Sequence, residues 1–129
     1  MRYRERKEKK CLNCSEMIPN RNTFCNNKCQ GEYEFINKTL PRFQNGEIFE
    51  RDTLKRVLIY FDGDKCSICD ITNWNGKKIT LQVDHIDGNC GNNGKNNLRL
   101  LCPNCHSQTD TWGNKNKGNG RRSKGLPLR

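Results

Sequence analysis

The stretch of sequence that decides the fold runs from Asp84 to His106 and reads DHIDGNCGNNGKNNLRLLCPNCH. Both histidines of the chain lie in this stretch, and a Cys-x-x-Cys pair stands near its end. A second pair of this kind, Cys66 and Cys69, lies upstream. We therefore expect two metal sites with different roles, one that holds a small fold together and one that takes part in chemistry.

The two cysteine pairs can supply four sulfur ligands to one ion. Cysteines separated by two residues suit a tight turn, and two such turns complete a tetrahedral zinc site with no open position. A closed site of this kind is structural. The CxxCH pattern at Cys102 is also found where haem is attached covalently, but the upstream pair accounts better for the cysteines. The predicted zinc ligands are Cys66, Cys69, Cys102 and Cys105.

The periodicity around this site predicts a small α+β fold stapled by metal. A helix is expected from about Asp52, a candidate N-cap, because apolar residues follow at helical spacing. Strands are expected over about 79–84 and 97–101, paired as a hairpin. A last helix has Pro103 at its first position, where the missing NH costs nothing, and fades near Thr111.

A further cysteine unit, residues 11–38, precedes these elements. Its first pair has the same spacing of two, and its second pair is four apart, one turn of a helix predicted over 26–38. All four sulfurs can therefore reach one ion, which predicts a second structural zinc. Its ligands would be Cys11, Cys14, Cys25 and Cys29.

The composition limits the size of the core. The chain has 129 residues, of which 32% are hydrophobic, and its mean hydropathy is −1.04. Such a chain cannot fill a large core, so metal staples are expected. No apolar signal or membrane-spanning segment is evident, so we expect an intracellular protein with reduced cysteines that bind metal. A secreted disulfide scaffold also fits the cysteine count, but CxxC pairs favour metal.

The formal net charge is +10, and both ends of the chain concentrate it. Charge of this sign favours nucleic acid or an anionic surface as the partner, whereas tails that only maintain solubility are the simpler alternative. The predicted divisions are a disordered basic arm (1–10), a four-cysteine zinc finger (11–38), a linker (39–50), a second domain (51–112) and a disordered basic tail (113–129).

The hairpin offers ligands for a hard cation. His106 directly follows Cys105 on a helix, so it points about 100° away from that cysteine and is free for another role. With Asp84 it could hold Mg²⁺ or Mn²⁺. His85 would stay off the metal as a general base, since histidine ordinarily titrates near neutral pH. Asn97 could hydrogen-bond this base or its loop.

Two alternatives stay open at this point. A buried or capping histidine is the structural explanation of His106. Adjacent residues of a strand point to opposite faces, so Asp84 and His85 can serve one site only if the backbone bends between them, for which the turn residues after His85 are suited.

The set Asp84-His85, Asn97 and His106 resembles the motif of the HNH endonucleases, whose core is the ββα-metal or His-Me finger fold. The named H, N and H would be His85, Asn97 and His106. The resemblance covers about residues 52–112, and the two CxxC pairs are similar to those of a zinc-stapled subgroup common in phage and bacterial genomes. The N-terminal unit looks like a treble-clef finger.

This resemblance implies a metal-dependent endonuclease that hydrolyses phosphodiester bonds in double-stranded DNA, by nicking or by cutting both strands. Its single catalytic Mg²⁺ or Mn²⁺ would be held by Asp84 and His106, and His85 would activate water. Arg99 is a candidate phosphate contact because it follows Asn97 by two residues in the predicted strand, a solvated charge being the alternative. Cys90 departs from the family pattern and has no assigned role.

Within this class, a phage-type homing endonuclease in the cytoplasm of a bacterial or phage-infected cell is the most specific expectation. Packaging and restriction nucleases are also compatible. The rival is a non-catalytic zinc-finger protein that binds nucleic acid or regulates, but such a protein would not need this His-Asn-His set. We expect a monomer or weak dimer, and we expect Trp74 and Trp112 to pack in the fold rather than stack on bases.

Overall fold

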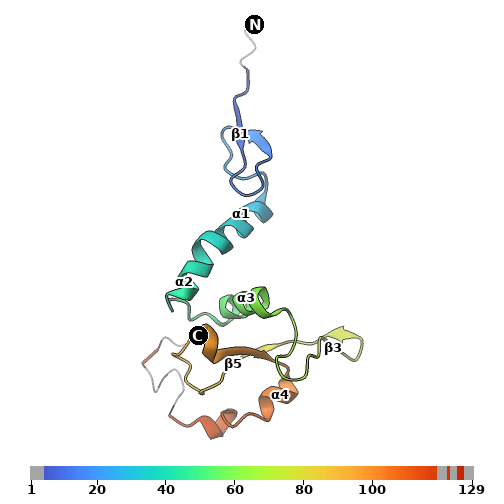
Figure 1. Cartoon of the computed structure of the whole chain (residues 1–129), viewed down its shortest axis with the longest axis vertical. Helices are drawn as coiled ribbons and strands as arrows, with labels where there is room; N and C mark the ends of the chain where they lie inside the picture. The colour runs from blue at the N-terminus through green and yellow to red at the C-terminus, as the bar shows by residue number, and fades with distance from the viewer. Residues whose placement is uncertain (1–4, 119–121, 123–124, 127–129) are drawn as a thin grey trace. The chain divides into compact units, whose positions relative to one another are not determined.

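The computed structural model describes residues 5–118, 122 and 125–126 (Figure 1). The chain divides into two compact units, Met1–Pro41 and Arg42–Arg129, and each unit contains one of the predicted cysteine groups. None of the described helices is both long enough and apolar enough to cross a membrane.

The first unit opens with an antiparallel hairpin. Strand β1 (Glu8–Lys10) pairs with β2 (Met17–Pro19), and Lys9 lies opposite Ile18. The disorder predicted for residues 1–10 is therefore wrong at Glu8–Lys10, while residues 1–4 lie outside the described residues. The strand forms because a cysteine turn, closed by a 2.8 Å hydrogen bond from Cys11 N to Glu16 O, returns the chain alongside it.

A helical segment follows the hairpin. Helix α1 (Asn27–Glu34) continues through a π-helical turn, η1 (Phe35–Thr39), into α2 (Leu40–Gln44). The predicted linker 39–50 is thus helical up to Gln44. Pro41 lacks the NH that an α-helical ladder requires, and the wider turn before it, closed by Leu40 N to Phe35 O, fits this interruption.

Helix α3 (Arg51–Asp62) provides the apolar face that its spacing predicts, with Leu54, Val57 and Leu58 buried. Asp52 is not its N-cap, contrary to expectation. Glu50 takes that position without a side-chain bond, and Asp52 lies in the first turn, where a negative charge is favourable. The helix ends at Gly63, whose φ of 82° suits glycine.

A short hairpin that the sequence did not predict comes next. Strands β3 (Asn73–Trp74) and β4 (Lys77–Lys78) join through Asn75 and Gly76, whose φ values are 51° and 74°. Asn-Gly favours two-residue turns with both φ values positive. Trp74 is 64% exposed, so the prediction that it packs in the fold is wrong.

The predicted central hairpin is confirmed. Strand β5 (Gln82–His85) pairs antiparallel with β6 (Leu98–Leu101), and Asp84 lies opposite Arg99. Helices α3 and α4 (Pro103–Ser107) both contact these two strands (Figure 1). The predicted small, metal-stapled α+β fold is therefore confirmed, with two strands and the following short helix at its centre.

The end of the second unit differs from expectation in two respects. Helix α4 begins with Pro103 at its first turn, as predicted, but it ends at Ser107 rather than near Thr111. The predicted disordered tail begins with a 3-10 turn, η3 (Gly113–Asn116). Much of the remaining tail lies outside the described residues.

The core of the second unit is small and lies between α3 and the central hairpin. Its largest fully buried side chains include two from each element and two zinc-ligand candidates: Val57, Leu58, Leu100, Leu101, Cys66 and Cys102. A core in which cysteines take up this share of the buried volume depends on the metal as well as on apolar burial.

We predict that Leu100→Ala, in zinc-replete buffer, lowers the free energy of unfolding by about 2–5 kcal/mol, because it leaves a cavity in this core. Leu100 is 0% exposed. Chemical denaturation measures the change. The matched control is Ile68→Ala, at a position that is 55% exposed, and it should change stability by no more than about 0.5 kcal/mol. Equal effects would show that the core lies elsewhere.

Candidate functional site

Two groups of four cysteines converge as their spacings predict. In each group the four sulfur atoms lie within 4.8 Å of one another. Tetrahedral zinc with metal–sulfur bonds of about 2.3 Å requires sulfurs about 3.8 Å apart. Cys69 Sγ and Cys102 Sγ are 3.8 Å apart, and Cys14 Sγ and Cys25 Sγ are 3.7 Å apart. Both groups therefore fit structural zinc: Cys11, Cys14, Cys25 and Cys29, and Cys66, Cys69, Cys102 and Cys105.

The first cysteine pair of each group forms the same backbone turn. Ser15 N donates to Cys11 O and Asp70 N donates to Cys66 O, each over 3.0 Å. Ser15 and Asp70 also share a positive φ, of 63° and 59°. Because two unrelated stretches adopt one turn around their cysteines, the turn is a feature of the ligand geometry rather than of the local sequence.

The backbone of each turn favours one thiolate. The NH of Cys14 is the main influence that lowers the pKa of Cys11 to about 6. Burial alone would raise the pKa of Cys66, but the NH groups of Cys69, Cys102 and Ile68 outweigh it and lower the pKa to about 6. Other thiols in each group are held protonated: burial first, then neighbouring sulfurs, raise the pKa of Cys105 to about 12. Four thiolates can therefore coexist in a group only with a cation among them.

A second set of candidate metal ligands lies beside the second cysteine group. Asp84, on β5, is 3% exposed, and its Oδ1 atom lies 3.5 Å from Nε2 of His106 on α4. Two neighbouring ligands of an octahedral cation with bonds of about 2.0–2.1 Å lie about 3 Å apart. The two atoms are thus close to the separation that one small hard cation requires.

The protonation of His106 leaves the correct atom free. Gln82 Oε1 lies 2.5 Å from Nδ1 of His106 and can only accept from an Nδ1–H. Nε2 then carries a lone pair that faces the carboxylate of Asp84. Burial lowers the pKa of His106, which favours this neutral form over the imidazolium. Two facing electron pairs repel unless a cation lies between them, so this chemistry fits a metal.

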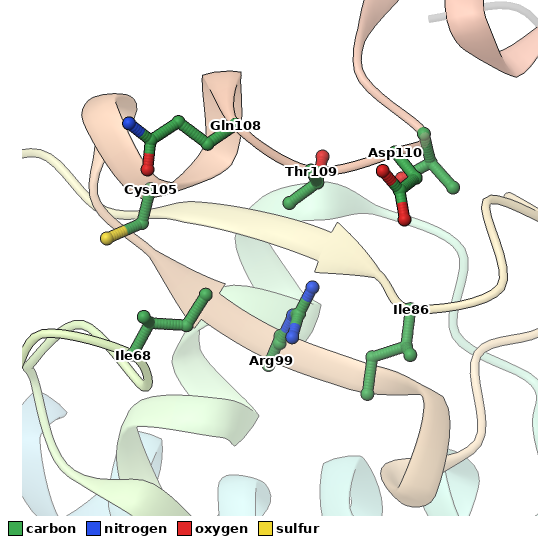
Figure 2. A pocket seen from close by; sticks show the side chains of 8 residues that line it. Ile68, Ile86, Arg99, Cys105, Gln108, Thr109 and Asp110 are labelled. Atoms are coloured by element: carbon green, nitrogen blue, oxygen red, sulfur yellow. The ribbon is translucent and has the colours of Figure 1, made fainter.

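Arg99 and an open hollow complete this side of the site. Arg99 Nε donates to Asp84 Oδ2 over 2.7 Å. Its guanidinium group faces a hollow of about 420 Å³ between Ile68 and Ile86 on one side and Thr109 and Asp110 on the other (Figure 2). A positive group at the floor of an open hollow can receive an anion such as phosphate.

His85 is held by a residue that the sequence analysis missed. Its Nε2 atom lies 2.7 Å from Oδ1 of Asn93, which is 4% exposed. The oxygen can only accept, so Nε2 carries a proton, and in the neutral ring the lone pair is then on Nδ1. The amide nitrogen of Asn93 is buried and has no hydrogen-bond partner among the described residues. Among the described residues, the contact with His85 is therefore the one hydrogen bond that the Asn93 side chain forms.

The Asn97 side chain forms hydrogen bonds with the loop after His85 rather than with the His85 side chain. Its amide donates to Asp87 Oδ1 over 2.8 Å and to Asn92 O over 2.9 Å, and its oxygen accepts from Asp87 N. Further hydrogen bonds hold the Asp87 carboxylate in its ionised form. Burial would raise the pKa of Asp87, but hydrogen bonds from Asn92, Asn89 N and Asn97 lower it. Asn97 therefore closes the loop that follows His85.

The far side of this loop meets the start of the tail. Asn116 Nδ2 donates to Gly88 O over 2.7 Å, and a Cβ atom at Gly88 would collide with Asn116 and Thr111. Gly88 also has a φ of 72°. Glycine is required here for both reasons, and the turn can therefore follow His85 directly.

The structure joins the predicted residues in two groups. Arg99 and His106 each contact Asp84, whereas His85, within the described residues, forms no hydrogen bond or ion pair with these three. The premise that Asn97 and Arg99 share a strand is wrong, because Asn97 ends a 3-10 turn, η2 (Lys95–Asn97). Trp112 packs edge-on against His106, with ring centroids 4.8 Å apart.

Of the residues that were missed, Gln82 had a signal in the sequence. It precedes Asp84 by two residues in a strand and so shares its face. Asn93 had none, because one of several asparagines in a polar loop cannot be singled out by spacing. The pairing of Arg99 with Asp84 required the strand register.

Comparison with known proteins supports the class that this geometry indicates. Over 54 residues the chain is 50% identical to the H-N-H endonuclease F-TflIV of Escherichia phage T5, and the match covers 42% of this chain. The match covers 24% of that protein, so the chain spans about a quarter of the relative's length. No family model and no solved structure matches the chain. The predicted resemblance to the HNH endonucleases is confirmed.

We predict that the purified protein holds two zinc ions per chain, measured by inductively coupled plasma mass spectrometry. Cys66→Ser and Cys11→Ser should each reduce the content to about one, because each removes one of four ligands. Cys90→Ser is the matched control, since Cys90 lies in neither group, and it should leave both ions in place. A content of one in the unaltered protein would overturn the N-terminal site.

Proposed function

We propose that this protein is a metal-dependent endonuclease that hydrolyses phosphodiester bonds in double-stranded DNA. The observation that carries the proposal is the pair of lone-pair atoms, Asp84 Oδ1 and His106 Nε2, that face each other 3.5 Å apart. A purely structural zinc protein has no need for a buried carboxylate oxygen and a neutral imidazole nitrogen that face each other beside a zinc group that is already complete.

Asp84 and His106 would hold one Mg²⁺ or Mn²⁺. When bound, such a cation stabilises the negative charge that develops on the phosphate and on the leaving oxygen. Gln82 keeps His106 in the tautomer that can coordinate, and Arg99 keeps the Asp84 carboxylate oriented through its other oxygen. The hollow beside Arg99 is open to the incoming phosphate.

His85 would take a proton from the attacking water at Nδ1, since Asn93 occupies Nε2. A phosphate and a water molecule must fit between the general base and the cation. This division of roles is consistent with the described residues, among which the His85 side chain forms no hydrogen bond or ion pair with Asp84 or His106. The turn at Gly88, fastened by Asn97 and Asn116, holds the segment after His85 in place.

The relative and the net charge support narrower proposals. The phage origin of the relative supports a phage-type homing enzyme, and the net charge of +10 supports DNA as the substrate. We propose that the protein acts as a monomer or weak dimer inside the cell, with residues 51–112 as the nuclease domain and residues 11–38 as an attached finger.

We predict that the protein nicks or linearises supercoiled plasmid when Mg²⁺ or Mn²⁺ is added. His85→Ala should reduce the rate by about 10²–10⁴-fold, as expected for the loss of a general base, while binding of the same plasmid persists. Gel electrophoresis of time points measures cleavage. The metal is omitted rather than chelated in the blank, because a chelator would also strip structural zinc.

The matched control for this experiment is Asn104→Ala, an exposed position on the helix that carries His106, and it should cut at the original rate. His106→Ala should lose cleavage but retain two zinc ions. Cleavage by His85→Ala at the original rate would refute the mechanism, and binding without cleavage would favour a non-catalytic nucleic-acid-binding protein.

We further predict that Asn93 positions His85 by fixing its tautomer. In Asn93→Ala the ring should populate both neutral tautomers, and kcat should fall by about 10-fold or more with little change in KM. Asn93→Asp keeps an acceptor oxygen at the same place and should recover the tautomer and part of kcat. Nitrogen-15 NMR measures the tautomer directly, and two histidines in the chain make the assignment simple.

A role for Asn93 in stability alone would give a different result. Both variants would then have a lower melting temperature. The nitrogen-15 chemical shifts of the His85 ring would be unchanged, and kcat of the folded fraction would stay at the original value. His106 serves as the internal reference, because its tautomer depends on Gln82 and should not respond.

A further inference from the structure

The first unit contains a basic hollow that the proposed chemistry does not use. It lies beside the β1–β2 hairpin and has a volume of about 370 Å³. Three of its five lining residues are cations and none is acidic: Arg6, Lys7, Pro19, Asn20 and Arg21.

The backbone brings these cations together from two separate stretches. Lys7 O accepts a 3.0 Å hydrogen bond from Asn20 N, which extends the hairpin beyond its paired strands. Asn22 N donates to Pro19 O over 2.9 Å, which turns the chain around Arg21. The convergence is therefore fixed by main-chain bonds and does not depend on flexible side chains.

No counter-ion from the described part of the protein pairs with these cations. Within the described residues none of Arg6, Lys7 and Arg21 forms an ion pair, although Glu5 and Glu8 are close in sequence. Like charges that converge without a counter-ion raise the free energy, and a bound polyanion removes this cost. The hollow is thus suited to a ligand with repeated negative charges.

The lysines on the helical segment of the same unit, in contrast, form ion pairs with acidic residues. Lys28 and Lys38 are each paired four residues along the helical segment, with Glu32 at 3.9 Å and Glu34 at 3.2 Å. Cys29, at the start of α1, belongs to a group that would carry a charge of about −2 with zinc bound. Among the described residues that these two comparisons cover, the cations without an ion pair therefore lie at the hairpin and not on the helical segment.

We propose that the hairpin hollow binds the phosphate backbone of nucleic acid, and that α1 does not form this contact. The inference takes nucleic acid as the partner from the proposed function. Guanidinium groups suit phosphate because their planar donors match two of its oxygens, and contacts of this kind position a protein without reading sequence. The first unit then supplies sequence-independent affinity, while the second unit performs hydrolysis.

The test compares two double variants of the full chain in a His85→Ala background, which leaves the duplex uncut. Arg6→Gln/Arg21→Gln removes two hairpin cations, and Lys28→Gln/Lys38→Gln removes two helix cations as the matched control. Binding to a fluorescein-labelled random-sequence duplex of about 30 base pairs is followed by anisotropy between about 50 and 200 mM salt.

The slope of log K against log salt is negative. We expect the hairpin variant to reduce its magnitude by about 1.8, or about 0.9 per lost phosphate contact. Its affinity at about 100 mM salt should fall by about tenfold or more. The helix variant should change the slope by less than about 0.5. Zinc content of two per chain confirms that each variant is folded.

Equal loss in the two variants would overturn the proposal, because the hollow would then be no different from any other surface charge. Tighter hairpin-dependent binding to phosphatidylserine vesicles than to the duplex would overturn it as well, since the partner would be a membrane surface. Cleavage is measured separately, without the His85→Ala change. A protein that binds through the hairpin but cuts no DNA would refute the proposed function and leave this inference standing.

Discussion

The convergence of Cys66, Cys69, Cys102 and Cys105 is the constraint on which the second unit depends. It fastens the turn before the hairpin to the helix after it, so that two distant stretches of chain meet at one point. A further bond, from Ser67 N to Leu100 O over 2.8 Å, joins that turn to β6. Because the apolar core is small, this link determines where α4 lies against the strands, and hence where His106 lies relative to Asp84.

The sequence predicted the features that follow from spacing. Both cysteine groups, the central hairpin and the apolar face of α3 could be read directly, since ligand geometry and side-chain periodicity are local rules. The position of His106 outside the zinc group could also be reasoned, because four thiolates leave no vacancy and the next helical residue points elsewhere.

Features that depend on contacts between distant residues could not be predicted. Strand β1 exists because Met17–Pro19 returns beside it, and nothing in its Lys-rich sequence indicates a strand. The pairing of Arg99 with Asp84 depends on register, and the choice of Asn93 among the loop asparagines depends on which one the fold buries. The helix continues to Gln44 because a π-helical turn before Pro41 accommodates the missing NH of the proline.

Because Cys105 and His106 are adjacent, the geometry of the cysteine group determines where the His106 side chain lies. One short helix carries both Cys105 and His106, so the length of the bonds from a zinc ion to sulfur would set the position of the imidazole. An ion with longer bonds to sulfur would fill the same group and keep the fold, yet it would move His106 away from its place opposite Asp84. The metal chosen by the cysteine group would then affect the geometry of the candidate site at Asp84 and His106, although it lies outside that site.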